Sequence, residues 1–65
     1  MRYELVSVVR DMGERVITFR DTNTDREYIY YLTEIRHVRL PYFKSFILPL
    51  LADIRSGKYD TIDPI

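Results

Sequence analysis

The spacing of apolar positions changes about halfway along the chain, from strand-like runs to a helical repeat. In the first half, three short runs rich in β-branched and aromatic residues are separated by turn-forming residues. Such runs predict strands at about residues 2–10, 14–21 and 26–32. Because the connections are short, we expect the strands to form an antiparallel β-meander.

Charge supplies a test of how the three strands pair. We expect Gly13 to provide the positive φ of a bulged first turn, with Arg10 opposite Glu14. Opposite charges across neighbouring strands are favourable, and like charges are unfavourable. The resulting alignment pairs opposite charges throughout, namely Arg10 with Glu14, Glu4 with Arg20, Arg20 with Glu27, and Asp21 with Arg26.

This alignment sorts the strand residues onto two faces, because side chains alternate along a strand. One face is mostly apolar and is expected to be covered; it carries Tyr3, Leu5, Ser7, Val9, Ile17, Phe19, Tyr28, Tyr30 and Leu32. The other is mixed and is expected to stay open; it carries Glu4, Val6, Val8, Val16, Thr18, Arg20, Glu27, Ile29 and Tyr31.

The second half of the chain predicts one amphipathic helix at about residues 41–56. Pro41 suits the first helical position, Gly57 suits the stop, and Pro49 should kink or restart the helix. The apolar stripe consists of Phe43, Phe46, Ile47, Leu50, Leu51 and Ile54. A helix of about 15 residues is about as long as a seven-residue strand, so it can cover one sheet face. The predicted fold class is therefore α+β: a three-stranded meander with one C-terminal helix packed on it.

Two segments leave alternatives open. Residues 33–40 fit either a short helix capped by Thr33 or an irregular crossing. We expect one domain at residues 1–57 followed by a tail at 58–65, which either folds back or serves as a peptide for a partner.

Composition limits how so small a domain can be reinforced. The chain has 65 residues and no cysteine, so disulfides and thiolate metal sites are excluded. Its single histidine predicts neither a metal site nor another cofactor. No apolar run is long enough to cross a membrane, and the chain reads as cytoplasmic.

Known catalytic arrangements are missing from the sequence. There are only two glycines, too few for a phosphate-binding loop, and the serines have no base other than His37. A lone histidine between basic neighbours is most often a surface residue. We expect a non-enzymatic protein.

The open sheet face supplies the leading functional hypothesis. An exposed sheet face usually alternates towards polar residues, whereas this face carries an apolar cluster, which is typical of an interaction site. The predicted partner-binding residues are Val6, Val8, Val16, Ile29 and Tyr31. We expect a protein-binding module that forms homodimers or binds another protein as a regulator or inhibitor.

A basic segment supplies the alternative hypothesis. Ten basic and ten acidic residues cancel overall, which disfavours a dedicated nucleic-acid binder. A local cluster around residues 36–44 nevertheless offers phosphate contacts, together with arginines of the sheet. Its members are Arg36, His37, Arg39 and Lys44.

Overall fold

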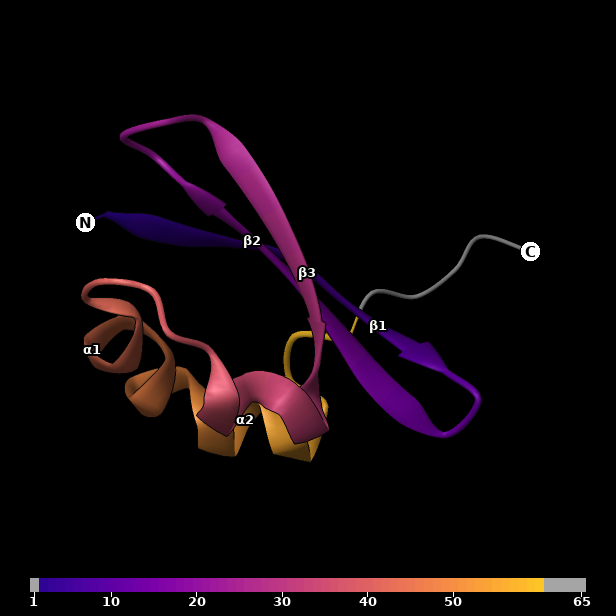
Figure 1. The fold of residues 1–65 in the computed structure, drawn as a ribbon. Coiled ribbons are helices and arrows are strands. Elements are labelled where there is room, and N and C mark those ends of the chain that lie inside the picture. Colours follow the sequence, from indigo (N-terminus) through magenta and orange to yellow (C-terminus); the bar gives the residue numbers. More distant parts are fainter. Residues whose placement is uncertain (1, 61–65) are drawn as a thin grey trace.

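A three-stranded antiparallel sheet forms the first half of the chain (Figure 1). The computed structural model describes residues 2–60. Strand β1 spans Tyr3–Asp11, β2 spans Glu14–Asp21 and β3 spans Arg26–Tyr31, in the spatial order β1-β2-β3. The predicted meander is confirmed, with strand ends within one residue of those expected.

The second half of the chain forms a helical layer on one face of this sheet (Figure 1). After the 3-10 helix η1 at Leu32–His37, the C-terminal helical segment consists of α1 at Phe43–Ile47, η2 at Leu48–Leu50 and α2 at Leu51–Ser56. The predicted α+β class is therefore confirmed.

Local residue chemistry sets the ends and the interruption of the C-terminal helical segment. The segment begins at Phe43 rather than at Pro41, because Tyr42 takes a left-handed conformation with φ 63°. Pro49 lies in η2, where the tighter 3-10 turn replaces the α-helix, as its missing N–H predicts. Gly57 ends the segment with φ 89°, as expected for a glycine stop.

The second hairpin pairs as the charges predict. Arg20 lies opposite Glu27 and Asp21 lies opposite Arg26. The Asp21 carboxylate accepts a hydrogen bond from the N–H of Asn23 at 2.9 Å, which closes the turn. Burial alone would raise the pKa of Asp21, but hydrogen bonds from Arg2 and from the Asn23 N–H lower it on balance.

The first hairpin departs from the predicted pairing. Met12 and Gly13 both have positive φ, 50° and 83°, so they form a two-residue turn of the type that matches strand twist. Asp11 consequently pairs with Glu14, where Arg10 was expected. The pairing near the start of β1 is nevertheless as predicted, so one extra residue is absorbed between Leu5 and Ser7 as a β-bulge.

The bulge reverses the direction of every later side chain in β1. Val8 pairs with Ile17 and both side chains are fully buried, so the predicted exposure of Val8 on the open face is wrong. Ser7 pairs with Thr18 and Val9 pairs with Val16, which places both on the open face rather than the covered one. A one-residue offset exchanges the two faces because side chains alternate.

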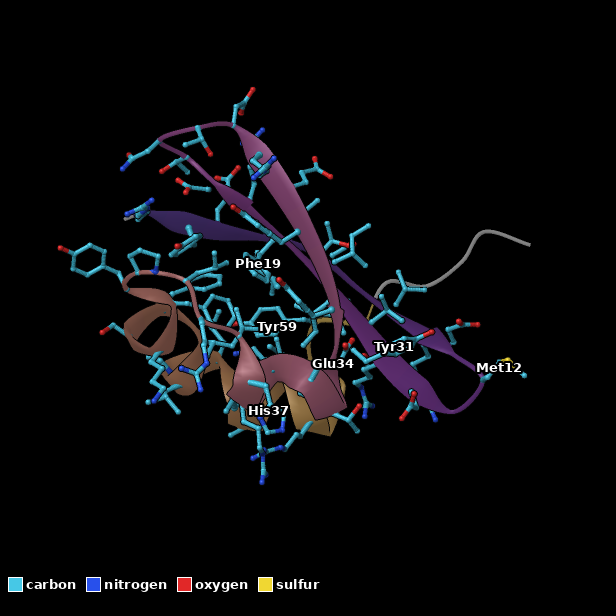
Figure 2. The ribbon with its side chains drawn as sticks, viewed as in Figure 1. Met12, Phe19, Tyr31, Glu34, His37 and Tyr59 are labelled. Atoms are coloured by element: carbon cyan, nitrogen blue, oxygen red, sulfur yellow. The ribbon has the colours of Figure 1, made fainter. Side chains whose placement is uncertain are left out.

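The core lies between the covered face and the helical layer, and Phe19 is at its centre (Figure 2). The Phe19 ring stacks on Tyr28 at 5.4 Å and Tyr30 at 5.9 Å, and it lies 4.6 Å from the ring of Phe43. Tyr3 is also buried, which raises the pKa of its hydroxyl group. The buried apolar residues are Tyr3, Val8, Ile17, Phe19, Ile35, Val38, Phe43, Phe46, Ile47 and Ile54.

The segment after β3 combines both alternatives that the sequence left open. The 3-10 helix η1 begins after Tyr31, whose N–H donates to the Glu34 carboxylate at 2.9 Å, so Thr33 is not its N-cap. Residues 38–40 then cross to the C-terminal helical segment without regular structure.

The start of the tail folds back onto the sheet. Tyr59 packs against the core, and Asp60 forms a parallel bridge to Val8 at the edge of β1. The Arg15 guanidinium donates two hydrogen bonds to the Asp60 carboxylate, at 3.0 and 3.2 Å. The rest of the predicted tail, residues 61–65, lies outside the described residues.

Candidate functional site

The open face of the sheet presents one apolar cross-strand row and one mixed row beside it. The apolar row consists of Val9, Val16 and Tyr31, and the mixed row consists of Ser7, Thr18 and Ile29. Val6 lies at the bulge, directly before Ser7 of the mixed row. We define the open-face patch as Val6, Val9, Val16, Ile29 and Tyr31.

Three apolar side chains of this patch are exposed to solvent. Ile29 is 66 % exposed, Val6 48 % and Tyr31 40 %, whereas Val9 and Val16 are half-buried by their neighbours. The helical layer packs on the opposite face, and residues 2–60 place no helix over the patch (Figure 1).

The structure brings together four of the five predicted partner-binding residues: Val6, Val16, Ile29 and Tyr31. Val8 is excluded because it points into the core, and sequence reasoning missed Val9, which takes its place in the patch. The signal for Val9 was the two-residue Met12-Gly13 turn, since a pairing that starts at Asp11 and Glu14 sets Val9 opposite Val16.

Acidic rows border the patch at both ends. At one end, Glu4, Arg20 and Glu27 lie side by side, and Arg20 forms an ion pair with Glu4. At the other end, Asp11 pairs with Glu14 next to the turn. Together these rows contain four carboxylates and one guanidinium, so the border of the patch is net negative.

The ion pair between Arg15 and Asp60 holds the start of the tail against the first hairpin. Arg15 lies opposite Arg10, a like-charge pair that the predicted alignment had avoided. The hydrogen bonds from Arg15 hold the pKa of the Asp60 carboxyl below its usual range, and Arg10 contributes further in the same direction. Asp60 thus offsets the repulsion between the two arginines.

The predicted basic residues gather on the helical layer, away from the sheet. His37 lies on the outer side of this layer (Figure 2). A cavity of about 670 Å³ is lined by all four predicted basic residues, Arg36, His37, Arg39 and Lys44, together with the exposed Tyr42. The structure therefore assembles the predicted basic cluster.

A second, larger groove adjoins the first and adds residues that the sequence did not single out. Its volume is about 930 Å³, and it shares Arg36, His37 and Lys44 with the smaller cavity. Arg55 and an apolar floor complete its lining. The floor comes from both η1 and the C-terminal helical segment, a juxtaposition that only the folded chain reveals.

The described part of the chain has neither a cluster of potential metal ligands nor a helix suited to span a membrane. Within residues 2–60, no three His, Cys, Asp or Glu side chains come together in a group that could hold a metal ion. In the same residues, no helix is both long enough and apolar enough to cross a bilayer. The shifted pKa values belong to ion pairs and to the buried Tyr3, which are structural features.

No protein-family model matches the chain, and neither a curated protein nor a solved structure matches it.

Proposed function

We propose that this chain is a small non-enzymatic protein-binding module that self-associates through the open-face patch. The observation that carries the proposal is the exposure of Ile29 and Tyr31 on β3 and of Val6 on β1, on either side of Val16, on a sheet without a helix over this face. A contiguous apolar patch of this kind marks an interaction site more often than a plain surface.

A second copy is a suitable occupant because the open face of one sheet can pack on the open face of another. Two such sheets stack about 10 Å apart, with their inner side chains interdigitating. A 65-residue chain buries only roughly 60 % of its unfolded surface, so further burial adds useful stability. A two-fold symmetric pair would use the same patch on both copies.

The acidic rows limit the strength of this association. A two-fold axis in the interface plane places the Glu4–Arg20–Glu27 row against either the same row or the Asp11–Glu14 row of the second copy. In both arrangements, a net negative row faces another net negative row. The face is three strands wide, about 14 Å at about 4.8 Å per strand, and its strands of six to nine residues are about 20–30 Å long at about 3.3 Å per residue. Its area is therefore about 300–400 Å², smaller than the roughly 800 Å² per partner of a standard interface. The dimer should therefore be weak and should strengthen with salt.

The biological role that fits such a module is a regulator or inhibitor of a partner protein, which would compete for the same patch. A weak homodimer leaves the patch available to that partner at low concentration. The proposal includes a cytoplasmic location, because the chain contains no cysteine that an oxidising compartment could cross-link.

Analytical ultracentrifugation over a concentration and salt series tests the proposal. The wild-type mass is expected to rise from monomer towards dimer between micromolar and millimolar concentration, and to rise further at high salt. Ile29→Glu is expected to remain monomeric, because it adds negative charge at the most exposed residue of the patch. Leu48→Glu is the matched control, since Leu48 is 63 % exposed on the helical layer.

Two results would reject self-association through this patch. One is a wild-type protein that remains monomeric at every concentration and salt. The other is an equal mass for wild type and Ile29→Glu under conditions in which wild type associates.

A further inference from the structure

We propose that the larger groove of the helical layer docks a short acidic amphipathic helix from another protein. This helical groove is lined by Leu32, Thr33, Ile35, Arg36, His37, Lys44, Ile47, Leu48, Leu51 and Arg55. It is separate from the open-face patch, because the two lie on opposite sides of the sheet (Figure 1).

The floor of the groove is aliphatic and graded in depth. Ile35 and Ile47 are almost fully buried, Leu32 and Leu51 are half-buried, and Leu48 is 63 % exposed at the edge. The exposed aliphatic side chains of the floor therefore adjoin the buried core directly, without a layer of polar side chains between them. Apolar anchors spaced i, i+3 or i+4, and i+7 on a helix fill grooves of this kind.

The rim of the groove carries positive charge that the domain does not neutralise. Within residues 2–60, no carboxylate oxygen lies within 4.0 Å of the cationic groups of Arg36, Lys44 or Arg55, whereas four other basic residues form such ion pairs. The chain has equal numbers of acidic and basic residues, so this basic rim reflects segregation of charge rather than an excess. Carboxylates flanking the apolar anchors of a docked helix would supply the missing partners.

The character of the floor favours a peptide over a nucleic acid. Single-stranded nucleic acids gain much of their affinity by stacking bases on aromatic side chains. The helical groove is lined by no Phe, Tyr or Trp, and the exposed Tyr42 belongs to the smaller cavity beside it. Aliphatic side chains match leucine anchors, and the cations then recognise the acidic flanks.

Fluorescence polarisation with a designed probe tests the assignment. The probe is a labelled helical peptide with leucines at i, i+4 and i+7 and glutamates at the remaining positions. Binding to the wild-type chain is expected at low salt and should weaken as salt rises, because the rim pairs are exposed to screening. A peptide with lysine in place of each glutamate should not bind, since the basic rim repels it.

Three variants locate the site. Leu48→Glu changes the floor and Lys44→Glu changes the rim, and each is expected to weaken binding roughly tenfold or more. Both positions are exposed, so the variants should retain the wild-type circular dichroism spectrum. Met12→Glu is the control, because Met12 is 97 % exposed in the turn between β1 and β2, outside both the groove and the open-face patch, and should bind the peptide as wild type does.

Three outcomes would overturn the inference. The first is the absence of peptide binding at low salt, and the second is equal peptide affinity in wild type and both groove variants. The third is tight binding of a labelled oligodeoxythymidine that Lys44→Glu abolishes and Leu48→Glu leaves unchanged, because this would identify a phosphate-binding surface instead.

Discussion

Val8, and not its neighbour Val9, is the valine through which this part of β1 packs into the core. Val8 is fully buried and pairs with the equally buried Ile17, while the next residue, Val9, faces the other way. The sequence gives these two valines the same chemistry, so only the backbone direction distinguishes them. Their contributions to stability should therefore differ sharply.

Val8→Ala is expected to lower the free energy of unfolding by about 2–3 kcal/mol, because it leaves a cavity in a packed core. Val9→Ala, on the half-buried open face, should cost less than about 1 kcal/mol. Urea denaturation at a protein concentration that keeps the chain monomeric measures both values. A larger loss for Val9→Ala would place the bulge elsewhere in β1.

Asp60 should make part of the stability depend on pH. The pKa of Asp60 is lowered in the folded chain by Arg15, so its contribution is complete above the unfolded value of about 4. That contribution is lost as pH falls through the lower folded pKa. Asp60→Asn should therefore lower the melting temperature at neutral pH and reduce the further loss on acidification.

The control for this prediction is the double variant Arg15→Met, Asp60→Asn, which should melt at or above Asp60→Asn, because it also removes the Arg10–Arg15 repulsion that the neutral side chain no longer offsets. If the melting temperature fell equally on acidification in wild type and in Asp60→Asn, the Asp60 carboxylate would have no part in that fall. Asp21 also loses its negative charge at low pH, so the comparison rests on the difference between variants.

At the scale of elements, the second hairpin was predictable and the first was not. Turn-forming residues and opposite charges both fix the alignment of β2 with β3, and the structure follows them. In β1 the same reasoning favoured Arg10 opposite Glu14, whereas the two-residue turn places Asp11 there. The mismatch is absorbed at Val6, and no residue type in that run of similar valines marks where a bulge falls.

The helical half shows the same division between local and long-range causes. Pro49 and Gly57 act on their own backbone, so the interruption and the end of the segment were predictable. The left-handed Tyr42 was not, because aromatic residues seldom adopt positive φ without support from tertiary contacts.

Gly57 and Gly13 offer a matched test of how the tail is held. Both have positive φ, so replacing either by alanine should cost about 1–2 kcal/mol of backbone strain. A Cβ at Gly13 would meet no atom within 4 Å, whereas one at Gly57 would lie 3.1 Å from Asp60 Oδ2 and 3.3 Å from Arg15 Nη2. Gly57→Ala should therefore destabilise the chain more than Gly13→Ala in urea denaturation.

An equal cost for the two alanine variants would contradict this account of the tail. It would mean that the ion pair between Arg15 and Asp60 shifts freely away from a new methyl group. Asp60→Asn provides a further control, because weakening the pair should reduce the extra cost of Gly57→Ala.

At the scale of the whole molecule, a chain with equal numbers of acidic and basic residues presents two surfaces with different charged borders. Acidic rows border the open-face patch, and basic side chains surround the helical groove on the other layer. The sheet between them keeps the two surfaces apart (Figure 1). We propose that each surface selects a different partner, a second copy on one side and an acidic helix on the other.

The residues of these two surfaces could be predicted from the sequence to different extents. Most of the open-face patch follows from alternation along β2 and β3, which needs no long-range information. The basic residues of the groove were visible as a cluster near residues 36–44, but its floor was not. Ile35 and Leu48 are thirteen positions apart, and they line one groove only because η1 packs beside the C-terminal helical segment.

The central claim is that the open-face patch is the surface through which copies of this chain meet. An amide NMR dilution series tests it residue by residue, because only amides near an interface change shift with concentration. The account predicts changes centred on Val9, Val16, Ile29 and Tyr31 that grow with salt and vanish in Ile29→Glu. Shifts that stay constant at every concentration, or that change around Leu48 instead, would contradict it.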